Sequence, residues 1–380
     1  MSEYRLKALA FQRLTFNFPQ TAKELYAAAG TAEEINACRN DVRSMVPDAS
    51  DALCSLLASD WSVALHWAEK ELAWCEKKGI SFLCPEDEDY PQRLRNCLDA
   101  PVGLFFLGSA DLNARHAVSI VGTRQNTAYG RDCVERLVSD LKAMVPDVVI
   151  FSGLAYGIDV CAHRAALAAG ADTVGVVAHG LDTMYPASHR GIAAEMLAHG
   201  GVVSEYPSGT RCDRHNFLRR NRIVAALGDC TVVAESKAHG GSLVTARLAN
   251  DYNREVFAFP GRVGDDASEG CNSLIHDNKA AILLSARDIV DGLGWQTVQR
   301  QDAERKKGVQ LEAFPELSPE QQKIVDVLGD GDTQLNTISL KSGLPIGKIA
   351  ALLFELEMQG MVRPYAGGMY HLNEQGNNIK

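Results

Sequence analysis

The sequence predicts an α/β protein in three parts: an extended Rossmann-like parallel sheet core, an N-terminal helical domain and a C-terminal winged-helix domain. Three observations lead to this prediction. Strand-like apolar runs alternate with helical stretches in the middle of the chain, Ala-rich helical segments precede them, and a pattern of three helices and a hairpin follows. The length of 380 residues agrees with several domains, because one domain usually contains about 100–200 residues.

The first part, residues 1–84, is predicted to consist of short helices. One helical stretch at 23–29 stops at Gly30 and another at 62–78 stops at Gly79, and glycine commonly follows the last helical residue. We expect a small helical domain of a SAM-like or helix-hairpin-helix-like type.

The second part, residues 85–298, contains five strand-like apolar runs, at 118–121, 148–151, 173–177, 230–234 and 256–259. Continuous apolar runs are typical of parallel strands that are buried on both faces beneath helices. In such a sheet, ligands bind outside the carboxyl ends of the strands. The loops that follow these runs are therefore the first places to look for a site.

The third part, residues 316–380, follows a charged stretch at 299–315 that we interpret as a linker. It contains three helical stretches and a hairpin that turns at Gly367 and Gly368, which is the winged-helix pattern. Between residues 315 and 380 there are five basic and eight acidic residues, a net charge of −3. Because phosphate neutralisation supplies most nonspecific DNA affinity, we expect this domain to bind protein, or DNA only weakly.

Composition excludes several classes of protein. The formal net charge of −10 argues against coating nucleic acid through the overall field, so an anionic partner must meet a local patch. No apolar run approaches the roughly 18–20 residues of a membrane span, and the first residues lack a signal-peptide pattern. Ten scattered cysteines contain no Cys-x-x-Cys pair. We expect a cytoplasmic protein with reduced thiols and no membrane partner.

Three loops have the composition of phosphate-binding sites, since each leads into a helix N-terminus with free N–H groups. The candidate residues are Gly122, Thr123 and Arg124 in the first loop, Ser152 and Gly153 in the second, and Gly240, Gly241, Ser242 and Thr245 in the third. Structural roles are the alternative to phosphate binding. In the first loop, Gly122 would make a tight turn and the side chain of Arg124 would lie in solvent. In the second loop, the structural roles are a helix cap at Asp159 and a packed His163.

The segment 211–222 points most directly to nucleic acid. It carries five arginines and one acidic residue, a local charge of +4 in an acidic chain. Phe217 among them offers a flat face on which an unpaired base can stack. The alternative is a charged surface loop with Phe217 packed in the core.

Enzyme signatures are few. The sequence has no Walker A loop, no His-Glu-x-x-His motif and no Gly-x-Ser-x-Gly elbow, and we predict neither a metal site nor a cofactor. An alternative function is a Rossmann-like enzyme that binds nucleotides or nucleoside phosphates, with Glu205 or Glu235 as its acid or base. A scaffold that binds only protein is a third possibility.

Six motifs follow one another along the chain: Tyr-Pro-Gln-Arg-Leu at 90–94, Gly-Thr-Arg at 122–124, Ser-Gly-Leu-Ala-Tyr-Gly-Ile-Asp at 152–159, Phe-Leu-Arg-Arg-Asn-Arg at 217–222, Gly-Ser-Leu-Val-Thr at 241–245 and Phe-Pro-Gly at 259–261. This order resembles the DNA-processing protein A (DprA/Smf) family, from Tyr90 to Leu293. The resemblance implies a Rossmann-like domain that binds single-stranded DNA without cleaving it. It also implies a homodimer that protects incoming strands and helps load RecA during natural transformation and recombination.

The same resemblance assigns DNA-binding residues. The DNA-binding positions of the family correspond to Arg124, Phe217, Arg219 and Arg222 in this sequence, and less directly to Arg214. Two positions depart from the family pattern: Asn253 replaces a usual glycine, and Asn278 with Lys279 replaces a common Asp-Gly pair, so we expect altered turns there. Leu227, Leu243 and Leu248 are possible contributors to a dimer surface.

Overall fold

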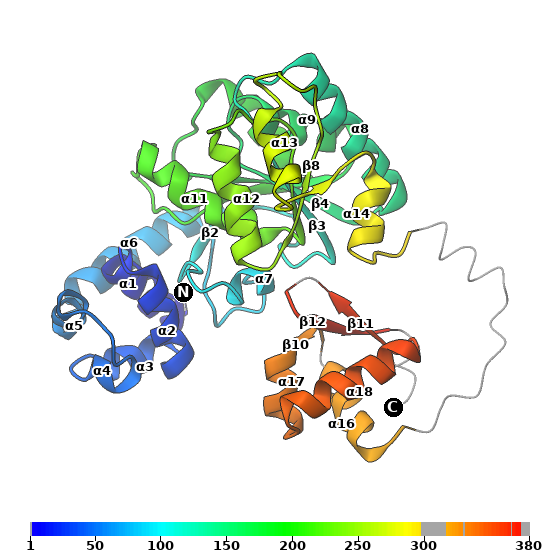
Figure 1. The fold of residues 1–380 in the computed structure, drawn as a ribbon. Helices are drawn as coiled ribbons and strands as arrows, with labels where there is room; N and C mark the ends of the chain where they lie inside the picture. Colours follow the sequence, from blue (N-terminus) through cyan, green and yellow to red (C-terminus); the bar gives the residue numbers. More distant parts are fainter. Residues whose placement is uncertain (1, 298–316, 330, 366, 374–380) are drawn as a thin grey trace.

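The computed structural model describes residues 2–297, 317–329, 331–365 and 367–373. Within these ranges the chain forms an N-terminal helical domain, a central α/β core and a C-terminal winged-helix domain (Figure 1). The predicted fold class is therefore confirmed. The stretch 299–315, which we interpret as a linker, lies outside the described residues.

The N-terminal domain is a cluster of helices around one apolar core. Its helices are α1 (Glu3–Thr15), α2 (Pro19–Ala29), α3 (Ala32–Ala37), α4 (Val42–Met45), α5 (Asp51–Ala58) and α6 (Ser62–Lys78). The predicted helix at 62–78 is confirmed, and Gly79 ends it in the left-handed conformation, with φ of 68°. The other predicted helix forms the second half of α2.

Two buried polar side chains attach this domain to the core. Gln12 on α1 donates through Nε2 to the carbonyls of Gly103 and Glu205, at 3.2 and 2.9 Å. Glu71 on α6 accepts hydrogen bonds from the amide and the hydroxyl of Ser208, at 2.7 and 2.6 Å. The attachment is therefore specific, because each buried polar group needs its partner.

The core is built on a nine-stranded sheet in the order β1-β2-β6-β5-β4-β3-β7-β8-β9. Its strands are β1 (Ser81–Leu83), β2 (Leu104–Gly108), β3 (His116–Val121), β4 (Val148–Ser152), β5 (Asp172–Val177), β6 (Gly200–Ser204), β7 (Cys230–Val233), β8 (Glu255–Ala258) and β9 (Ala281–Ile282). The seven neighbouring strands β6, β5, β4, β3, β7, β8 and β9 run parallel to one another. At the other edge of the sheet, β2 pairs antiparallel with β6 and β1 pairs antiparallel with β2. Every residue of β3, β4 and β7 is buried, as the apolar runs predict.

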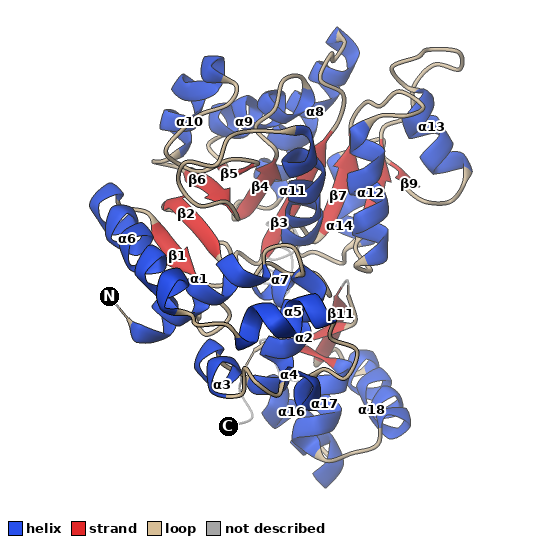
Figure 2. Ribbon diagram, turned by 90° about the vertical axis from the view of Figure 1, so that its left-hand side faces the viewer, coloured by secondary structure: helices blue, strands red, loops and turns tan. Residues whose placement is uncertain are grey.

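Helices cover both faces of the sheet (Figure 2). One layer contains α8 (Ala128–Met144), α9 (Ile158–Ala169) and α14 (Ala286–Gly292), and the other contains α7 (Gln92–Arg95), α11 (Arg214–Leu227), α12 (Gly241–Asp251) and α13 (Glu269–His276). A short 3-10 helix (Ala187–His189) and α10 (Arg190–Met196) lie near β5 and β6. The connections after β3 and β7 lead to opposite layers, so these neighbouring strands form the switch point where such sheets bind ligands.

Four strands of the core sheet were not expected from the sequence, and the reasons are local. β6 begins with two glycines, β9 has two residues, and the edge strands β1 and β2 have three and five. Glycines and very short segments give no apolar run in β1, β6 and β9, whereas β2 begins with an apolar run at 104–107 that we did not interpret as a strand. As a result, the sheet begins at Ser81, inside the stretch that we assigned to the helical domain.

The winged-helix domain has the predicted three helices and hairpin. It contains α16 (Pro319–Leu328), α17 (Leu335–Ser342), α18 (Ile346–Met358) and the strands β10 (Thr333–Gln334), β11 (Val362–Tyr365) and β12 (Met369–Leu372). Gly367 and Gly368 have φ of 81° and 69°, as a tight hairpin turn requires. No single helix in the described ranges is long and apolar enough to span a membrane; α17 and α18 reach that length and composition only as a pair bent by 108°.

His163 packs on the sheet, as the structural alternative expects. Its Nδ1 lies 2.7 Å from the hydroxyl of Thr173, which donates to the carbonyl of Ile150 at 2.9 Å. The hydroxyl proton is thus already used, so Nδ1–H is the donor and Nε2 carries no proton. Nε2 is buried and has no hydrogen-bond partner among the described residues, and burial lowers the pKa of His163 to about 3.

This burial predicts a pH dependence of stability. Between pH 6.5 and about pH 3 the unfolded chain binds a proton at this imidazole and the folded chain does not, so stability falls as the pH falls. His163→Asn keeps a donor near Thr173 without a titrating ring. Between pH 7 and pH 5, the unmodified protein should lose about 2 kcal/mol more unfolding free energy than this variant in urea titrations. The exposed His66→Asn change is the control and should keep the original pH slope; an unchanged slope in His163→Asn would contradict the assignment.

Candidate nucleic-acid interface

A cleft of about 1330 Å³ opens at the carboxyl-end edge of the parallel strands. Its walls come from the loops after β3, β4 and β7, from residues 183–185 and from the first turns of α11. Nine of the predicted site residues line it: Gly122, Thr123, Arg124, Arg214, Phe217, Gly240, Gly241, Ser242 and Thr245. Ser152, Gly153, Arg219 and Arg222 are not among its lining residues.

The loop after β3 is held tightly from below. A Cβ on Gly122 would lie 2.5 Å from Ile158, so only glycine fits where the loop crosses α9. The amide of Thr123 donates to the carbonyl of Glu235 at 2.8 Å, and its carbonyl accepts from the amide of Ile158 at 3.1 Å. This fixed backbone presents the exposed side chain of Arg124 to the cleft.

Glu235 has a structural role in this loop. Its carboxylate accepts hydrogen bonds from the amide and the hydroxyl of Thr127, at 2.9 and 2.5 Å, at the N-terminus of α8. A Cβ on Gly130 would lie 2.3 Å from this carboxyl group, so the helix packs directly on it. Glu235 is 1 % exposed and does not line the cleft.

The loop after β4 supports the cleft from behind. Ser152 is fully buried and donates its hydroxyl to the carbonyl of Ile120 at 2.6 Å. Gly153 leaves room for a guanidinium, since a Cβ there would lie 2.3 Å from Nη1 of Arg220. These two predicted residues therefore position the site from below its surface.

The loop after β7 contributes hydroxyls and exposed charge. Ser242 donates its hydroxyl to that of Ser236 at 2.9 Å, and Gly240 is required because a Cβ would lie 2.2 Å from the Ser236 hydroxyl. Gly241 has open space around its Cβ position at the start of α12. Lys237 from the same loop is exposed and lines the cleft.

From Arg214 onward the basic segment 211–222 is a helix, so the alternative of a charged surface loop is wrong for this part. Asp213 accepts a hydrogen bond from the amide of Asn216 at 2.8 Å and caps α11, which begins at Arg214. Because a helix turns about 100° per residue, its arginines point in different directions. Arg214 and Phe217, three residues apart, face the cleft, whereas Arg219 faces away from it.

Arg219 and Arg222 join α11 to its surroundings. Arg222 is 5 % exposed, and its Nη2 donates to Glu205 at 2.5 Å. Arg219 lies 3.4 Å from the same carboxylate, donates to the carbonyl of Phe16 and stacks over its ring at 3.9 Å. Glu205 is 2 % exposed and pairs with both guanidinium groups. The three residues thus hold α11 and the helical domain together.

Arg220 is the arginine that reaches the cleft from below. It is 4 % exposed, and its Nη1 donates to the carbonyls of Gly153, at 2.5 Å, and Val176. Burial raises the pKa of the neighbouring Asp159, an effect that the guanidinium of Arg220 opposes. Burial likewise lowers the pKa of Arg220, opposed by Asp159. The two buried groups stabilise each other's charged form.

Aromatic rings lie directly beside the cationic groups. Arg124 stacks over the ring of Phe217, 4.8 Å from its centroid, and Tyr185 meets that ring edge-on at 5.9 Å. Tyr156 and Tyr185 are each about half exposed and line the cleft. The cleft therefore offers flat apolar faces between positive charges, the combination used by proteins that bind single strands.

The predicted site residues omit five contributors to this cleft: Tyr156, Tyr185, Arg211, Arg220 and Lys237. Arg220 was identifiable from its position three residues after Phe217 once the segment was recognised as helical. Tyr156 lies in the motif at 152–159 and Tyr185 lies just before Pro186, and the spacing of these residues alone reveals no role for either ring.

Residues 81–294 match the family described as DNA recombination-mediator protein A, and residues 312–368 match the DprA winged helix domain. The chain belongs to the DNA recombination-mediator protein A family. It is 33% identical to protein Smf of Synechocystis over 78% of this chain and 81% of that protein. It is also 36% identical to a putative DNA processing protein DprA of Mycobacterium tuberculosis, over 77% of each. Membership makes it a DNA-processing protein of the recombination-mediator type.

Solved structures of the family share the fold. The X-ray structure of DprA from Streptococcus pneumoniae aligns with a TM-score of 0.62 at 30% identity, over 77% of this chain and 98% of that one. DprA from Helicobacter pylori aligns with a TM-score of 0.51 at 29% identity, over 56% of this chain and 94% of that one. The Helicobacter pylori protein is described as having a unique single-stranded DNA binding mode.

The two departures from the family pattern are compatible with the fold. Asn253 and Asn278 have φ of 55° and 54°, in the left-handed region. Asparagine enters this region more readily than other residues with a side chain. Asn253 and Asn278 therefore adopt the left-handed backbone conformation that glycine usually provides.

The structure predicts that Arg222 supports the fold. Arg222→Met should lower the unfolding free energy by about 3 kcal/mol, because removing one partner of a buried ion pair leaves Glu205 undercompensated. Urea titrations measure this loss. The exposed Arg214→Met change, also on α11, should shift stability by less than about 0.5 kcal/mol. Equal stability of both variants would show that Arg222 is not buried as described.

Proposed function

We propose that this chain binds single-stranded DNA in the cleft and acts as a non-catalytic recombination mediator. One observation carries the proposal: four exposed cations surround half-exposed aromatic rings at the switch point of a chain whose net charge is −10. The cations are Arg124, Arg211, Arg214 and Lys237. The single-strand binding described for the Helicobacter pylori relative supports the same function.

The arrangement favours unpaired over paired bases. Phosphates are neutralised by lysine and arginine whatever their sequence, which supplies affinity without distinguishing strands. Stacking on Phe217 or Tyr185 requires a base face that a duplex conceals. Arg220, whose charge is opposed by Asp159, holds its guanidinium 5.8 Å from the centroid of the Phe217 ring.

RecA and a second copy of the chain are the partners that we propose for this role. Both follow from the family resemblance, as does protection of the bound strand. Leu243 and Leu248 are partly buried and remain candidates for the dimer surface. Leu227 is fully buried in the core, so it is excluded as a surface contact. The cytoplasmic location also remains a prediction.

The enzyme alternative has less support. Glu205 and Glu235, its candidate acids or bases, are buried, accept structural hydrogen bonds and do not line the cleft. We expect no release of base or phosphate when purified protein is incubated with nucleoside monophosphates. Turnover that disappears in Glu235→Gln would restore this alternative.

Binding of labelled oligo-dT, followed by fluorescence anisotropy at several salt concentrations, tests the proposal. Phe217→Ala should weaken binding roughly 5- to 150-fold with little change in salt dependence, because stacking contributes about 1–3 kcal/mol per base. Arg124→Ala should reduce the salt slope by about 0.7, the value for one phosphate contact on a single strand.

Arg136→Ala is the matched control, since Arg136 is exposed on α8 and does not line the cleft. It should keep the original affinity and slope. A duplex of the same length should compete poorly. Equal affinity of all three variants, or absence of binding at low salt, would refute single-strand binding in this cleft.

A further inference from the structure

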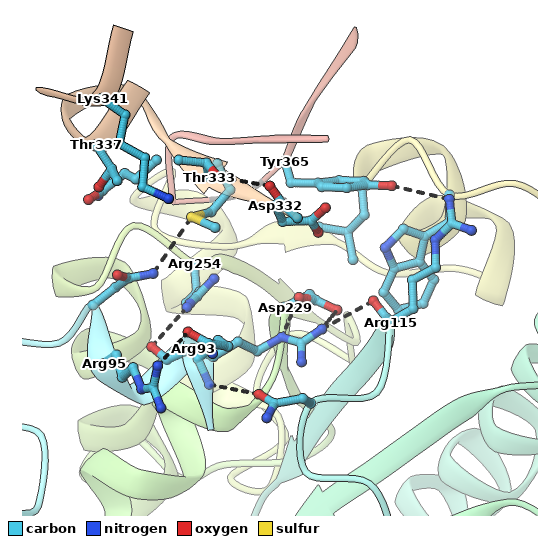
Figure 3. Close-up of a pocket in the computed structure, with 18 residues that line it drawn as sticks. Arg93, Arg95, Arg115, Asp229, Arg254, Asp332, Thr333, Thr337, Lys341 and Tyr365 are labelled. Carbon is cyan, nitrogen blue, oxygen red and sulfur yellow. Dashed lines mark hydrogen bonds and ion pairs between the residues drawn. The ribbon is translucent and has the colours of Figure 1, made fainter. Parts of the chain in front are cut away.

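A second pocket, of about 590 Å³, lies between the core and the winged-helix domain (Figure 3). Its core wall comes from α7 and from residues just before β3, β7 and β8, which is the amino-end edge of the sheet. Its other wall comes from β10, α17 and the hairpin of the winged-helix domain. A six-residue strand such as β3 spans about 20 Å, so this pocket is separate from the cleft. Its volume is in the range of small-ligand sites.

The pocket has an excess of positive charge. It is lined by five cations, Arg93, Arg95, Arg115, Arg254 and Lys341, and by the two carboxylates of Asp229 and Asp332. Both carboxylates have partners: Asp229 accepts two hydrogen bonds from Arg93, at 2.7 and 2.9 Å, and Asp332 pairs with His371. The other four cations form no ion pair with any carboxylate that the structure describes.

Arg254 is the decisive residue because it is buried and incompletely bonded. It is 6 % exposed, its Nη2 donates to the carbonyl of Arg93 at 3.2 Å, and its buried Nε has no hydrogen-bond partner among the described residues. Burial lowers the pKa of this guanidinium, an effect that Asp229 opposes. A buried charge with an unused donor is costly unless an anion approaches it.

The contact between the domains is otherwise weak. Among the described residues, three direct hydrogen bonds join the domains near the pocket: Asn96 donates to the Met369 sulfur at 3.6 Å, Arg115 to the Tyr365 hydroxyl at 3.5 Å, and Arg363 to the carbonyl of Gly294 at 3.5 Å. The last two are long for hydrogen bonds between nitrogen and oxygen. Lys341 reaches in from the winged-helix side, across from the arginines of the core (Figure 3). Like charges therefore face each other across the interface, and an anion between them would convert repulsion into a bridge.

We propose that this pocket binds a phosphate monoester, and that the bound phosphate clamps the winged-helix domain to the core. Guanidinium groups donate to phosphate in a fork, and Thr337 and Tyr365 add hydroxyls on the other wall. Two sources present this chemistry: a free nucleoside monophosphate and the 5′-phosphorylated end of a DNA strand. The pocket is open to both.

Calorimetric titration of the full chain with dTMP tests the site. The titration uses the Arg124→Ala background, so that the cleft contributes little. Lys341→Glu and Arg115→Ala should each weaken binding roughly tenfold or more, because each removes a charged donor to the phosphate. Lys323→Ala is the matched control: Lys323 is exposed in the same domain and does not line the pocket, so affinity should not change. Thymidine, which lacks the phosphate, should not bind.

Two further arms identify the source and the effect. Tighter binding of a 5′-phosphorylated than of a 5′-hydroxyl dT oligonucleotide in the same background would assign the strand end, and dTMP binding without that preference would assign the nucleotide. Small-angle scattering should show a smaller radius of gyration with dTMP, and no change in Lys341→Glu. Equal affinities in Lys341→Glu and Lys323→Ala, or no binding of any phosphate, would overturn the site. Binding with an unchanged radius would overturn the clamp.

Discussion

The cleft depends on one buried guanidinium, that of Arg220. It joins α11 to the carbonyls of Gly153 and Val176 and lies 5.8 Å beneath the ring of Phe217. The placement of this guanidinium determines which residues can stand at the neighbouring positions. Gly153 must lack a side chain to admit the guanidinium, and Asp159 supplies the opposing charge. A single side chain thus fixes the distance between the basic helix and the loop after β4.

The strands of the core were largely predictable because burial on both faces requires continuous apolar sequence. The five predicted apolar runs correspond to the strands β3, β4, β5, β7 and β8. β2 was also predictable from its apolar run at 104–107, although we did not expect it, and β1 has only three residues. β6 was not predictable, since Gly200 and Gly201 are selected by close contact with β5 and β2 rather than by apolar burial. Those contacts form only when the sheet assembles.

The site was predictable in composition but only partly in geometry. Glycine, hydroxyl and arginine residues in loops indicated an anion site, and nine of the predicted residues do line one cleft. The arginines of α11 could not be sorted without knowing that the segment is helical and which of its faces meets the cleft, because each residue is turned by about 100° from the one before it. Arg220 therefore reaches the cleft, whereas Arg219 and Arg222 meet Glu205. The pocket beside the winged-helix domain had no sequence signal, since Arg93, Arg115 and Arg254 lie in separate segments and meet only in space.

The two ends of the parallel sheet provide unequal environments for an anion. Helix N-termini and their partial positive charge meet at the carboxyl end, where they add to the field of Arg124 and Lys237. Helix C-termini meet at the amino end, and their partial negative charge stabilises arginines there while weakening the attraction for an anion. The cleft is therefore complete within the core alone. The amino-end pocket, by contrast, needs Lys341 and the hydroxyls of the winged-helix domain, which makes its occupancy dependent on how the domains are arranged.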